Sequence, residues 1–408
     1  MKITIIGLGY VGFPLAQLCI LKGHQVSGLD LSQKKVEDIN NGVNPISGSS
    51  FKEKFNASVD NPSFISDADA IIICVPTPVD ELKMPDLTPI KTATEYTAKN
   101  LTKNKPLIVV ESTINPGVME DVVKPLFDKY DLKVGIDYYI AHCPERINPG
   151  DEKWNVSNIP RVVGGYTSEC LDKAYCFYSS IINGKITKMS SIRTAEATKI
   201  IENTFRDINI AFVNELAKSF TKMGIDTVEV ITGASTKPFA FMPHFPSCGV
   251  GGHCIPVDPY YLIEEAKHKG FDHKFLKLAR EINNSMPEYT VNLMIDSLNE
   301  HQKAINGTTI GLLGLSYKAN VGDLRESPSL EIMKILKKKG ANVIAYDPYI
   351  KSDCRDLNEF QDKCQYIILA TNHKEFKDMD LSKVKILIDG KNMFYGHKMS
   401  ITYKGIGR

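Results

Sequence analysis

The sequence is that of a globular protein of enzyme size with almost no net charge. It has 408 residues, which at roughly 100 to 200 residues per domain predicts two or three domains. Hydrophobic residues make up 43% and charged residues 24%, values that exclude a disordered, collagen-like or coiled-coil chain. The 49 Lys and Arg residues against 48 Asp and Glu residues leave a net charge of +1, so we expect no nucleic-acid partner.

The cysteines and the hydropathy pattern exclude two further classes. The nine cysteines are odd in number and scattered, and they contain no C-x-x-C pair. We therefore expect buried thiols, with neither a disulfide framework nor a metal site. Because no apolar run approaches the roughly 18 residues that span a bilayer, we expect a cytoplasmic protein without membrane insertion.

Short apolar runs alternate with helical patterns over residues 1–190. Each run is rich in β-branched residues and bounded by Gly, Pro, Asp or Asn, as in strands of a parallel sheet that is buried on both faces. The pattern predicts a doubly wound α/β domain. The predicted strands span residues 3–6, 25–29, 70–75, 107–110, 138–141 and 161–163.

Residues 191–302 have a mainly helical pattern. The stretch 194–222 contains no Gly or Pro and is apolar on most sides, which predicts one long, buried helix. Its excess apolar surface predicts a homodimer that packs through this helix. A loop rich in Gly, Pro and Phe follows over residues 232–259, and helical patterns continue to about residue 302.

Residues 303–408 return to alternating strands and helices. Strands are predicted at 309–313, 342–346, 366–370 and 386–388, with a helix over 327–339 between the first two. The fold class is therefore α/β, with two doubly wound Rossmann-like domains. They are joined by the long central helix and a helical connector.

The sequence GLGYVG follows the first predicted strand and precedes a helical pattern. Its glycines allow a tight turn, close approach of a pyrophosphate to the backbone and close helix packing. The second strand ends at Asp30, whose carboxylate would bind both ribose hydroxyls and repel a 2′-phosphate, so we expect NAD rather than NADP. The alternative for the glycine sequence is a tight turn that binds no ligand. For Lys35, we expect a position either near the adenosine or in solvent. The expected cofactor contacts in this region are Gly7, Gly9, Tyr10, Val11, Gly12, Asp30 and Lys35.

Two later strand ends belong to the same edge of the predicted sheet. CVPTP (74–78) and ESTINPG (111–117) place small residues and hydroxyls where parallel strands open into a crevice. Pro76, Thr77 and Thr113 are therefore expected cofactor contacts. Simple turn formation explains either motif equally well.

The long helix carries Lys199 and Asn203, which the i, i+4 spacing places on one face. A lysine in apolar surroundings needs a partner or a role, and an ammonium beside an amide is a donor pair suited to a developing oxyanion. The alternative is a lysine whose amine reaches solvent from the edge of the helix.

A glycine-rich loop, GVGGHCIPVDPYYL (249–262), holds Cys254 with Asp258 four residues on. Glycines let a ligand approach the backbone, and a thiol on such a loop is an accessible nucleophile. Zinc binding by His253 and Cys254 is disfavoured, because adjacent residues do not easily share one metal and no spaced partner pair exists.

HCPERINPGD (142–151) follows a strand of the first domain and places Glu145 beside Arg146. A carboxylate of this kind acts on water while the arginine holds an anionic or carbonyl group. A surface ion pair is the alternative.

Taken together and in order, these motifs resemble those of the UDP-sugar 6-dehydrogenase family over nearly the whole chain. The chain is more similar to members that oxidise UDP-N-acetylglucosamine or UDP-N-acetylmannosamine than to UDP-glucose 6-dehydrogenases. The latter usually carry glutamate near Pro149 and lysine at Val257. The motifs are GLGYVG, CVPTP, ESTINPG, CPERINPGD, AEATKIIENTFRDINIAFVNELA, GGHCIPVDPYYL and GLSYKANVGDLRESPS.

The resemblance implies an NAD-dependent, four-electron oxidation of the sugar C6 alcohol to a uronate, with two NADH formed per product. It implies that the Cys254 thiolate captures the intermediate aldehyde as a thiohemiacetal, which is oxidised to a thioester. The product would be an aminouronic acid precursor of a surface polysaccharide. The implied catalytic residues are Cys254, the oxyanion donors Lys199 and Asn203, and the hydrolytic group Glu145, Thr113 and Asp258.

The resemblance also implies a binding role for the C-terminal domain. Lys318 and the loop 239–245 would hold uracil and diphosphate, and Arg325 would contact phosphate or cofactor. A helix-capping cluster at 323–328 is compatible with that role. The implied substrate contacts are Glu145, Arg146, Ile147, Asn148, Lys199, Asn203, Arg206, Gly251 and Lys318.

Three alternatives stay open from the sequence. One is oxidation of UDP-glucose itself. A second is a two-electron β-hydroxyacid-type dehydrogenase, which shares the N-terminal fold and a Lys and Asn pair on a long helix but needs no cysteine. A third is a non-catalytic module that senses nucleotides, against which the intact set of Cys254, Lys199 and Glu145 argues.

Overall fold

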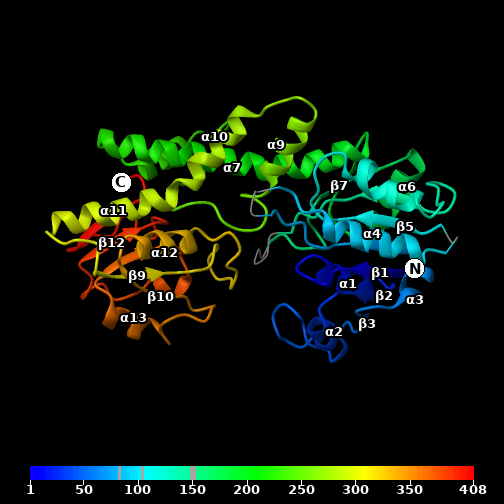
Figure 1. Ribbon diagram of the computed structural model, residues 1–408, viewed down its shortest axis with the longest axis horizontal. Helices are drawn as coiled ribbons and strands as arrows, with labels where there is room; N and C mark the ends of the chain where they lie inside the picture. Colours follow the sequence, from blue (N-terminus) through cyan, green and yellow to red (C-terminus); the bar gives the residue numbers. More distant parts are fainter. Residues whose placement is uncertain (81–83, 103–104, 148–152) are drawn as a thin grey trace. The chain divides into compact units, whose positions relative to one another are not determined.

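The chain folds into two compact units. The structure is a computed structural model that describes residues 1–80, 84–102, 105–147 and 153–408. The N-terminal unit comprises Met1–Glu202 and Tyr260–Gly270, and the C-terminal unit comprises Asn203–Pro259 and Phe271–Arg408. Each unit contains one β-sheet with helices packed against it (Figure 1).

The sheet of the N-terminal unit has the strand order β3-β2-β1-β4-β5-β6-β7-β8. Neighbouring strands are parallel except β6 and β7, which are antiparallel. The strands are β1 Lys2–Ile6, β2 Gln25–Leu29, β3 Asn56–Ser58, β4 Ala70–Ile73, β5 Leu107–Val110, β6 Tyr139–His142, β7 Arg161–Gly165 and β8 Ile186–Lys188. The helices are α1 Gly12–Leu21, α2 Gln33–Asn40, α3 Pro62–Ser66, α4 Thr88–Asn100, a π-helical turn Met119–Val123 that continues into α5 Lys124–Asp128, and α6 Ser168–Ile181.

The central strands of this sheet are apolar at every position because both faces are covered. In β4, Ala70 and Ile72 belong to one hydrophobic cluster, with residues of α1 and α6. Ile71 and Ile73 belong to a second cluster, with residues of α4 and α5. Alternate side chains of a strand point to opposite faces, so a continuous apolar run is what a strand between two helical layers requires.

The predicted α/β fold class is confirmed, with three differences in this sheet. Strand β4 ends at Ile73 rather than at residue 75. The strands β3 and β8 are not predicted, because three-residue segments with polar residues carry no periodic signal. The sheet is also not wholly parallel, because β7 runs against β6.

The sheet of the C-terminal unit is parallel throughout, in the order β10-β9-β11-β12-β13. Helices α11 and α12 contribute to the cluster on one face, and α13 contributes to the cluster on the other. The short strand β13 is not predicted from the sequence. The strands are β9 Thr309–Leu313, β10 Asn342–Tyr346, β11 Tyr366–Leu369, β12 Ile386–Asp389 and β13 Thr402–Gly405. The helices are α8 Thr227–Ala234, α10 Lys274–Asn284, α11 Met286–Glu300, α12 Pro328–Lys338, α13 Leu357–Lys363 and a 3-10 turn Lys374–Phe376.

Two helices contribute residues to both units. The predicted long helix is α7, Ile192–Met223, and α9 spans Asp258–His268. The expectation that α7 is buried nearly all round is wrong, since Ile201, Phe205 and Phe212 are 54%, 44% and 55% exposed. The chain covers one side of the helix, where Ile200 and Ala217 are fully buried, and leaves large apolar side chains on another.

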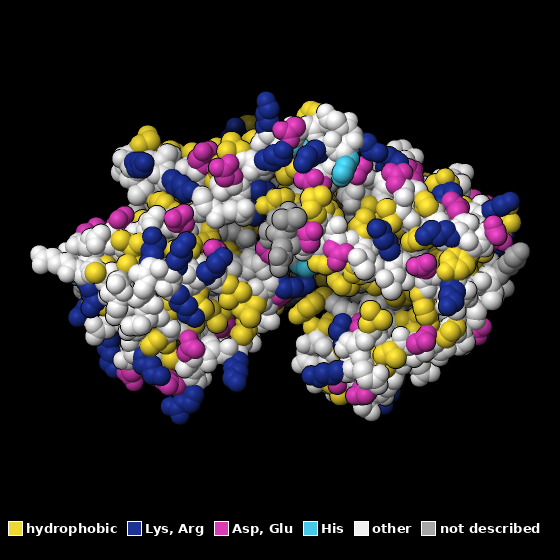
Figure 2. Space-filling view, in the orientation of Figure 1, with side chains coloured by type: hydrophobic (Ala, Val, Ile, Leu, Met, Phe, Trp, Pro, Cys, Tyr) yellow, Lys and Arg dark blue, Asp and Glu magenta, His cyan; other side chains and the backbone are white. Residues whose placement is uncertain are grey.

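Charged side chains of both signs are spread over the protein surface. On the face drawn in Figure 2, Lys and Arg side chains are interspersed with Asp and Glu side chains over each unit. This distribution agrees with the net charge of +1. Any anionic ligand must therefore be held by a few placed cations and by backbone N–H groups.

Candidate active site

The glycine turn between β1 and α1 has the geometry that a dinucleotide site requires. Gly7 has φ +92°, and a Cβ there would lie 2.7 Å from the Cys74 carbonyl oxygen. A Cβ on Gly12 would collide with the Gly7 carbonyl oxygen, so both positions require glycine. Nothing lies within 4 Å of a Cβ placed on Gly9. The turn therefore leaves space at the N-terminus of α1, where a pyrophosphate fits.

Asp30 follows β2 and holds this turn. Its Oδ2 accepts hydrogen bonds from the Leu8 backbone N–H (2.8 Å) and from Lys35 Nζ (3.0 Å), and its Oδ1 accepts one from the Ser32 backbone N–H. Lys35 forms an ion pair with Asp30, and its side chain is 39% exposed. Within the turn itself, Tyr10 is exposed and Val11 is half-buried.

The ends of β4 and β5 lie beside this turn through the sheet register. The Ser112 hydroxyl donates to the Val75 carbonyl oxygen at 2.6 Å, which joins the two strand ends. The Tyr261 hydroxyl of α9 donates to the carbonyl oxygen of Thr77, which is buried. Pro76 is exposed, and Thr113 is half-buried.

Glu145 lies in the loop after β6, and its backbone N–H donates to the Glu111 carbonyl oxygen at 3.1 Å. Burial raises the pKa of the Glu145 carboxyl, while the Lys199 and Arg161 cations lower it. Its Oε1 is buried and has no hydrogen-bond partner among the described residues. The geometry therefore presents a carboxylate that water or a ligand group could contact.

The residues that follow Glu145 hold the loop in place. Arg146 donates to the Pro160 carbonyl oxygen at 3.0 Å and forms an ion pair with Glu202 of α7. The Arg146 side chain is 18% exposed and that of Glu202 is 38% exposed. Ile147 is half-buried, and Asn148 lies outside the described residues.

The expected donor pair on α7 is buried. Lys199 and Asn203 are 6% and 7% exposed, so Lys199 does not extend into solvent. Asn203 Nδ2 donates to Asp258 Oδ2 at 2.6 Å, which joins α7 to the start of α9. Arg206, the remaining expected substrate contact on this helix, is exposed.

Glu196, a carboxylate on α7 that the sequence patterns do not single out, is fully buried three residues before Lys199. Its two oxygens accept hydrogen bonds from the backbone N–H groups of Gly117 (2.7 Å) and Met119 (2.9 Å). Burial raises its pKa to about 7, although the two N–H groups lower it. Glu196 therefore fastens the loop that carries Thr113 to the helix that carries Lys199. The only signal in the sequence is an acidic residue one helical turn before Lys199.

Cys254 is half-buried at the end of the glycine-rich loop, where its carbonyl oxygen accepts a hydrogen bond from the Asp258 backbone N–H at 2.9 Å. The loop packs against the segment after β9. A Cβ on either Gly251 or Gly252 would lie 2.7 Å from an atom of Tyr317. The Gly252 backbone N–H donates to the Arg325 carbonyl oxygen at 3.0 Å.

Two expected ligand-binding cations lie in that same segment of the C-terminal unit. Arg325 forms an ion pair with Asp323 at 2.7 Å, and its side chain is 49% exposed. The hydrogen bond to Asp323 raises the pKa of the Arg325 guanidinium, and the Cys254 thiol adds to this effect. Arg325 is therefore electrostatically coupled to Cys254. Lys318 is half-buried.

The expected site residues thus form two groups. The N-terminal unit holds the glycine turn, Asp30, Thr77, Thr113, Glu145 and Lys199. The C-terminal unit holds Asn203, Cys254, Asp258, Lys318 and Arg325. Within the described part of the chain, no cluster of three or more His, Cys, Asp or Glu residues is arranged to hold a metal ion. No helix in the same residues is long and apolar enough to span a membrane.

Comparison with known proteins assigns all three parts of the chain to one family, the UDP-glucose/GDP-mannose dehydrogenases. Residues 1–182 match its NAD-binding domain, residues 193–285 its central domain, and residues 311–397 its UDP-binding domain.

Individual relatives match over the full length. The chain is 36% identical to UDP-N-acetyl-D-glucosamine 6-dehydrogenase of Pseudomonas aeruginosa, covering 98% of this chain and 96% of the relative. It is 33% identical to UDP-N-acetyl-D-mannosamine dehydrogenase of Pyrococcus horikoshii, covering 100% and 99%. A solved structure of UDP-D-ManNAc dehydrogenase from that organism matches with a TM-score of 0.93 and 33% identity, covering 100% of this chain and 99% of the other.

Proposed function

Because the chain belongs to the UDP-glucose/GDP-mannose dehydrogenase family, we propose that it oxidises the C6 alcohol of a UDP-N-acetylhexosamine to the uronate. Its family makes it an NAD-dependent UDP-sugar dehydrogenase, and NAD is its cofactor. The names of two full-length relatives support an N-acetylated sugar, of gluco or manno configuration. UDP-glucose is the alternative substrate.

The hydrogen bond between Asn203 and Asp258 carries the mechanistic part of the proposal. It joins the polar face of α7 to the residue whose backbone N–H binds the Cys254 carbonyl oxygen. The nucleophile and one oxyanion donor therefore belong to one hydrogen-bonded structure. A β-hydroxyacid-type dehydrogenase does not need such a thiol.

The chain's own residues supply the covalent chemistry. The glycine turn and Asp30 hold NAD, which when bound accepts a hydride in each of two oxidations. The Cys254 thiolate adds to the C6 aldehyde and forms a thiohemiacetal. Lys199 and the second N–H of Asn203 donate to the oxyanion that forms.

Hydrolysis of the resulting thioester needs a base. Glu145 has a buried carboxylate whose pKa is raised by burial, which makes it a stronger proton acceptor than an exposed glutamate. Thr113 and Asp258 assist by orienting the attacking water. The water oxygen bonds to C6, the Cys254 thiolate leaves, and Glu145 takes the proton.

The exposed apolar face of α7 supports a homodimer that packs through this helix. Ile201, Phe205 and Phe212 expose large apolar area that a second copy of the chain would remove from water. Sedimentation equilibrium that gives twice the chain mass tests this assembly. A cytoplasmic location is part of the proposal, because the nine cysteines are thiols and that compartment keeps thiols reduced.

A panel of UDP-sugars tests the function directly. The purified chain is given NAD and UDP-N-acetylglucosamine, UDP-N-acetylmannosamine, UDP-N-acetylgalactosamine or UDP-glucose, and NADH and uronate are both measured. We expect two NADH per uronate with an N-acetylated sugar. One NADH per product would support a two-electron enzyme instead, and preference for UDP-glucose would support the alternative substrate.

Substitution of the nucleophile tests the mechanism. We expect Cys254→Ala to abolish uronate formation while NAD still binds, because the glycine turn is unchanged. Cys176→Ala is the matched control, since Cys176 is an exposed thiol on α6 and should leave activity intact. Full activity of the Cys254→Ala enzyme would refute the assigned nucleophile.

A further inference from the structure

The first turn of the C-terminal sheet repeats the geometry of the glycine turn in the N-terminal unit. Gly314 follows β9 with φ +86°, as Gly7 follows β1 with φ +92°. The Gly314 backbone N–H donates to the Tyr346 carbonyl oxygen at 2.8 Å, and the Gly7 N–H donates to the Leu29 carbonyl oxygen at 2.7 Å. In each case the acceptor is the last residue of the neighbouring parallel strand.

The repeat includes the carboxylate that follows that strand. Asp347 follows β10 as Asp30 follows β2. Asp347 Oδ2 accepts a hydrogen bond from the Leu315 backbone N–H at 2.8 Å, and Asp30 Oδ2 accepts one from the Leu8 N–H at 2.8 Å. Asp347 thus occupies the position at which a dinucleotide fold offers a carboxylate to a ribose.

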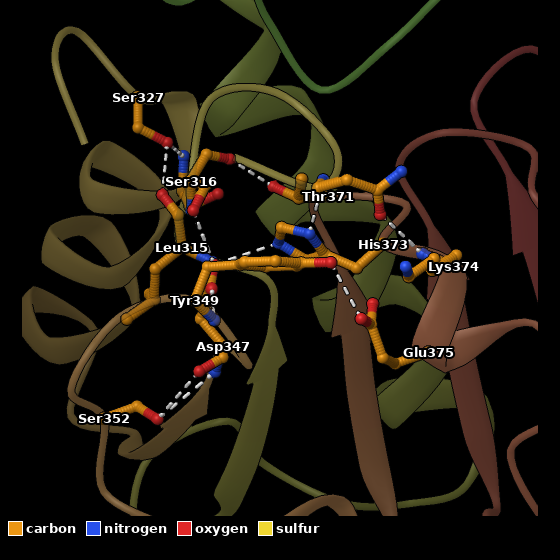
Figure 3. Close-up of polar contacts among 12 residues, drawn as sticks. Leu315, Ser316, Ser327, Asp347, Tyr349, Ser352, Thr371, His373, Lys374 and Glu375 are labelled. Carbon is orange, nitrogen blue, oxygen red and sulfur yellow. Dashed lines mark hydrogen bonds and ion pairs between the residues drawn. The ribbon is translucent and has the colours of Figure 1, made fainter. Parts of the chain in front are cut away.

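The carboxylate of Asp347 accepts hydrogen bonds from groups of the protein itself (Figure 3). Its Oδ2 also accepts hydrogen bonds from the Ser316 N–H and hydroxyl (both 2.9 Å) and from His373 Nε2 (3.0 Å), while Oδ1 accepts one from the Tyr349 N–H. The side chains of Asp347 and His373 are fully buried. Burial alone would raise the pKa of Asp347, but the hydrogen bonds from His373 and the backbone hold it well below its ordinary range. Oδ2 therefore accepts four hydrogen bonds from the protein and has no capacity left for a ribose hydroxyl.

His373 continues the contact to the loop that follows Ser316. Its Nδ1 accepts a hydrogen bond from the Asn320 backbone N–H at 2.9 Å, so the proton is on Nε2 and the ring is neutral. Asn320 has φ +61°, and its Oδ1 accepts a hydrogen bond from the Lys374 N–H at 3.0 Å. The segment 317–319, which includes Lys318, is therefore anchored on both sides.

The anchored segment also supports the loop that carries Cys254. Tyr317 is the residue against which Gly251 and Gly252 pack so closely that a Cβ on either would lie 2.7 Å from it. Cys254 follows Gly252 by two residues. A shift of Tyr317 would therefore be transmitted to the thiol loop, while a shift of Lys318 would move an expected ligand-binding cation.

We propose that His373 is a positioning residue for the reaction: its neutral ring, held by Asp347, accepts the Asn320 N–H and thereby places Lys318 and the Cys254 loop. The inference rests on the proposed function for the roles of Lys318 and Cys254. The same contacts distinguish the turn at Gly314 from the turn at Gly7. The carboxylate at the position of a ribose ligand, Asp347, here holds the backbone of its own unit.

Two amide variants separate the contacts of His373. His373→Asn keeps an acceptor near the position of Nδ1 and so keeps the contact with Asn320, whereas His373→Gln keeps only a donor near Nε2 for Asp347. We expect His373→Gln and His373→Ala to raise the KM for the UDP-sugar about tenfold, the loss expected for one buried hydrogen bond. The KM for NAD should stay unchanged, and His373→Asn should restore the UDP-sugar KM. Tyr349→Phe is the control, because it removes only a surface hydrogen bond to Glu375.

A direct probe of the loop distinguishes failure of this inference from failure of the proposed function. The alkylation rate of Cys254 by iodoacetamide, measured by mass spectrometry of its peptide, needs no turnover. We expect His373→Gln and His373→Ala to change this rate and His373→Asn to leave it near the wild-type value. Equal effects of the two amide variants, or no effect of His373→Ala on KM and alkylation, would overturn the proposal.

Discussion

Removal of the Arg161 charge should destabilise the N-terminal unit strongly. Arg161 Nη1 donates to Glu111 Oε2 at 2.8 Å, and both side chains are fully buried. The other carboxylate oxygen accepts a hydrogen bond from the Tyr178 hydroxyl at 2.6 Å. Arg161→Met fills a similar volume but leaves the Glu111 carboxylate buried without its cation.

The structure sets the expected magnitude. Loss of one member of a buried ion pair lowers the free energy of unfolding by about 3–5 kcal/mol, because the remaining charge is buried away from water without its partner. The double variant Glu111→Gln with Arg161→Met removes both charges and keeps an acceptor for Tyr178. We therefore expect it to be more stable than Arg161→Met alone by about 2 kcal/mol. Replacement of Arg193, whose ion pairs with Glu120 and Asp121 are exposed, should cost less than about 1 kcal/mol.

The chain offers a probe for this unit alone. Trp154 is its one tryptophan and belongs to the N-terminal unit. Urea unfolding followed by tryptophan fluorescence therefore reports on the unit that contains Arg161 and Glu111. The reasoning fails if the unfolding free energy of Arg161→Met is within about 1 kcal/mol of the wild-type value. It also fails if the loss of unfolding free energy in the double variant equals the sum of the losses in the two single variants.

Two further outcomes follow from the site. Glu196 has a pKa raised from 4.5 to about 7 by burial, so the folded unit binds its proton more tightly than the unfolded chain. The contribution of Glu196 to the unfolding free energy of this unit should fall by about 3 kcal/mol as pH rises through this range, so the difference in unfolding free energy between the wild type and Glu196→Gln should change by that amount in the same fluorescence assay. Gly9→Ala should abolish NAD binding without lowering the melting temperature, because a Cβ there meets no protein atom, whereas Gly12→Ala should lower both. NADH titration and thermal unfolding check this pair, and a lowered melting temperature for Gly9→Ala would contradict it.

Local patterns predicted much of the fold. The apolar runs at β1, β4 and β5 predict strands, because a strand that is covered on both faces needs apolar residues on both. The absence of Gly and Pro predicts α7 within two residues at each end. The turn at Gly7 to Gly12 was predicted because only glycine meets its φ angle and its close contacts. The motifs also predict the family.

The contacts around the site were not predictable in this way. Glu196 meets Gly117, Arg161 meets Glu111, and His373 meets Asp347, in each case across tens of residues. No periodicity relates such pairs. The exposure of Phe205 and Phe212 was also missed, since an apolar helix pattern does not say how much of its surface the same chain covers.

The sequence by itself determined most of the strands, the long helix and the glycine turn, because backbone conformation and the alternation of apolar residues are short-range properties. Tertiary structure decided which buried charges meet. A buried carboxylate needs hydrogen-bond donors or a cation, and the fold supplies these from residues that are distant in the sequence. In this way Glu196 joins the Thr113 loop to α7, and Asp347 holds the backbone of Leu315 and Ser316.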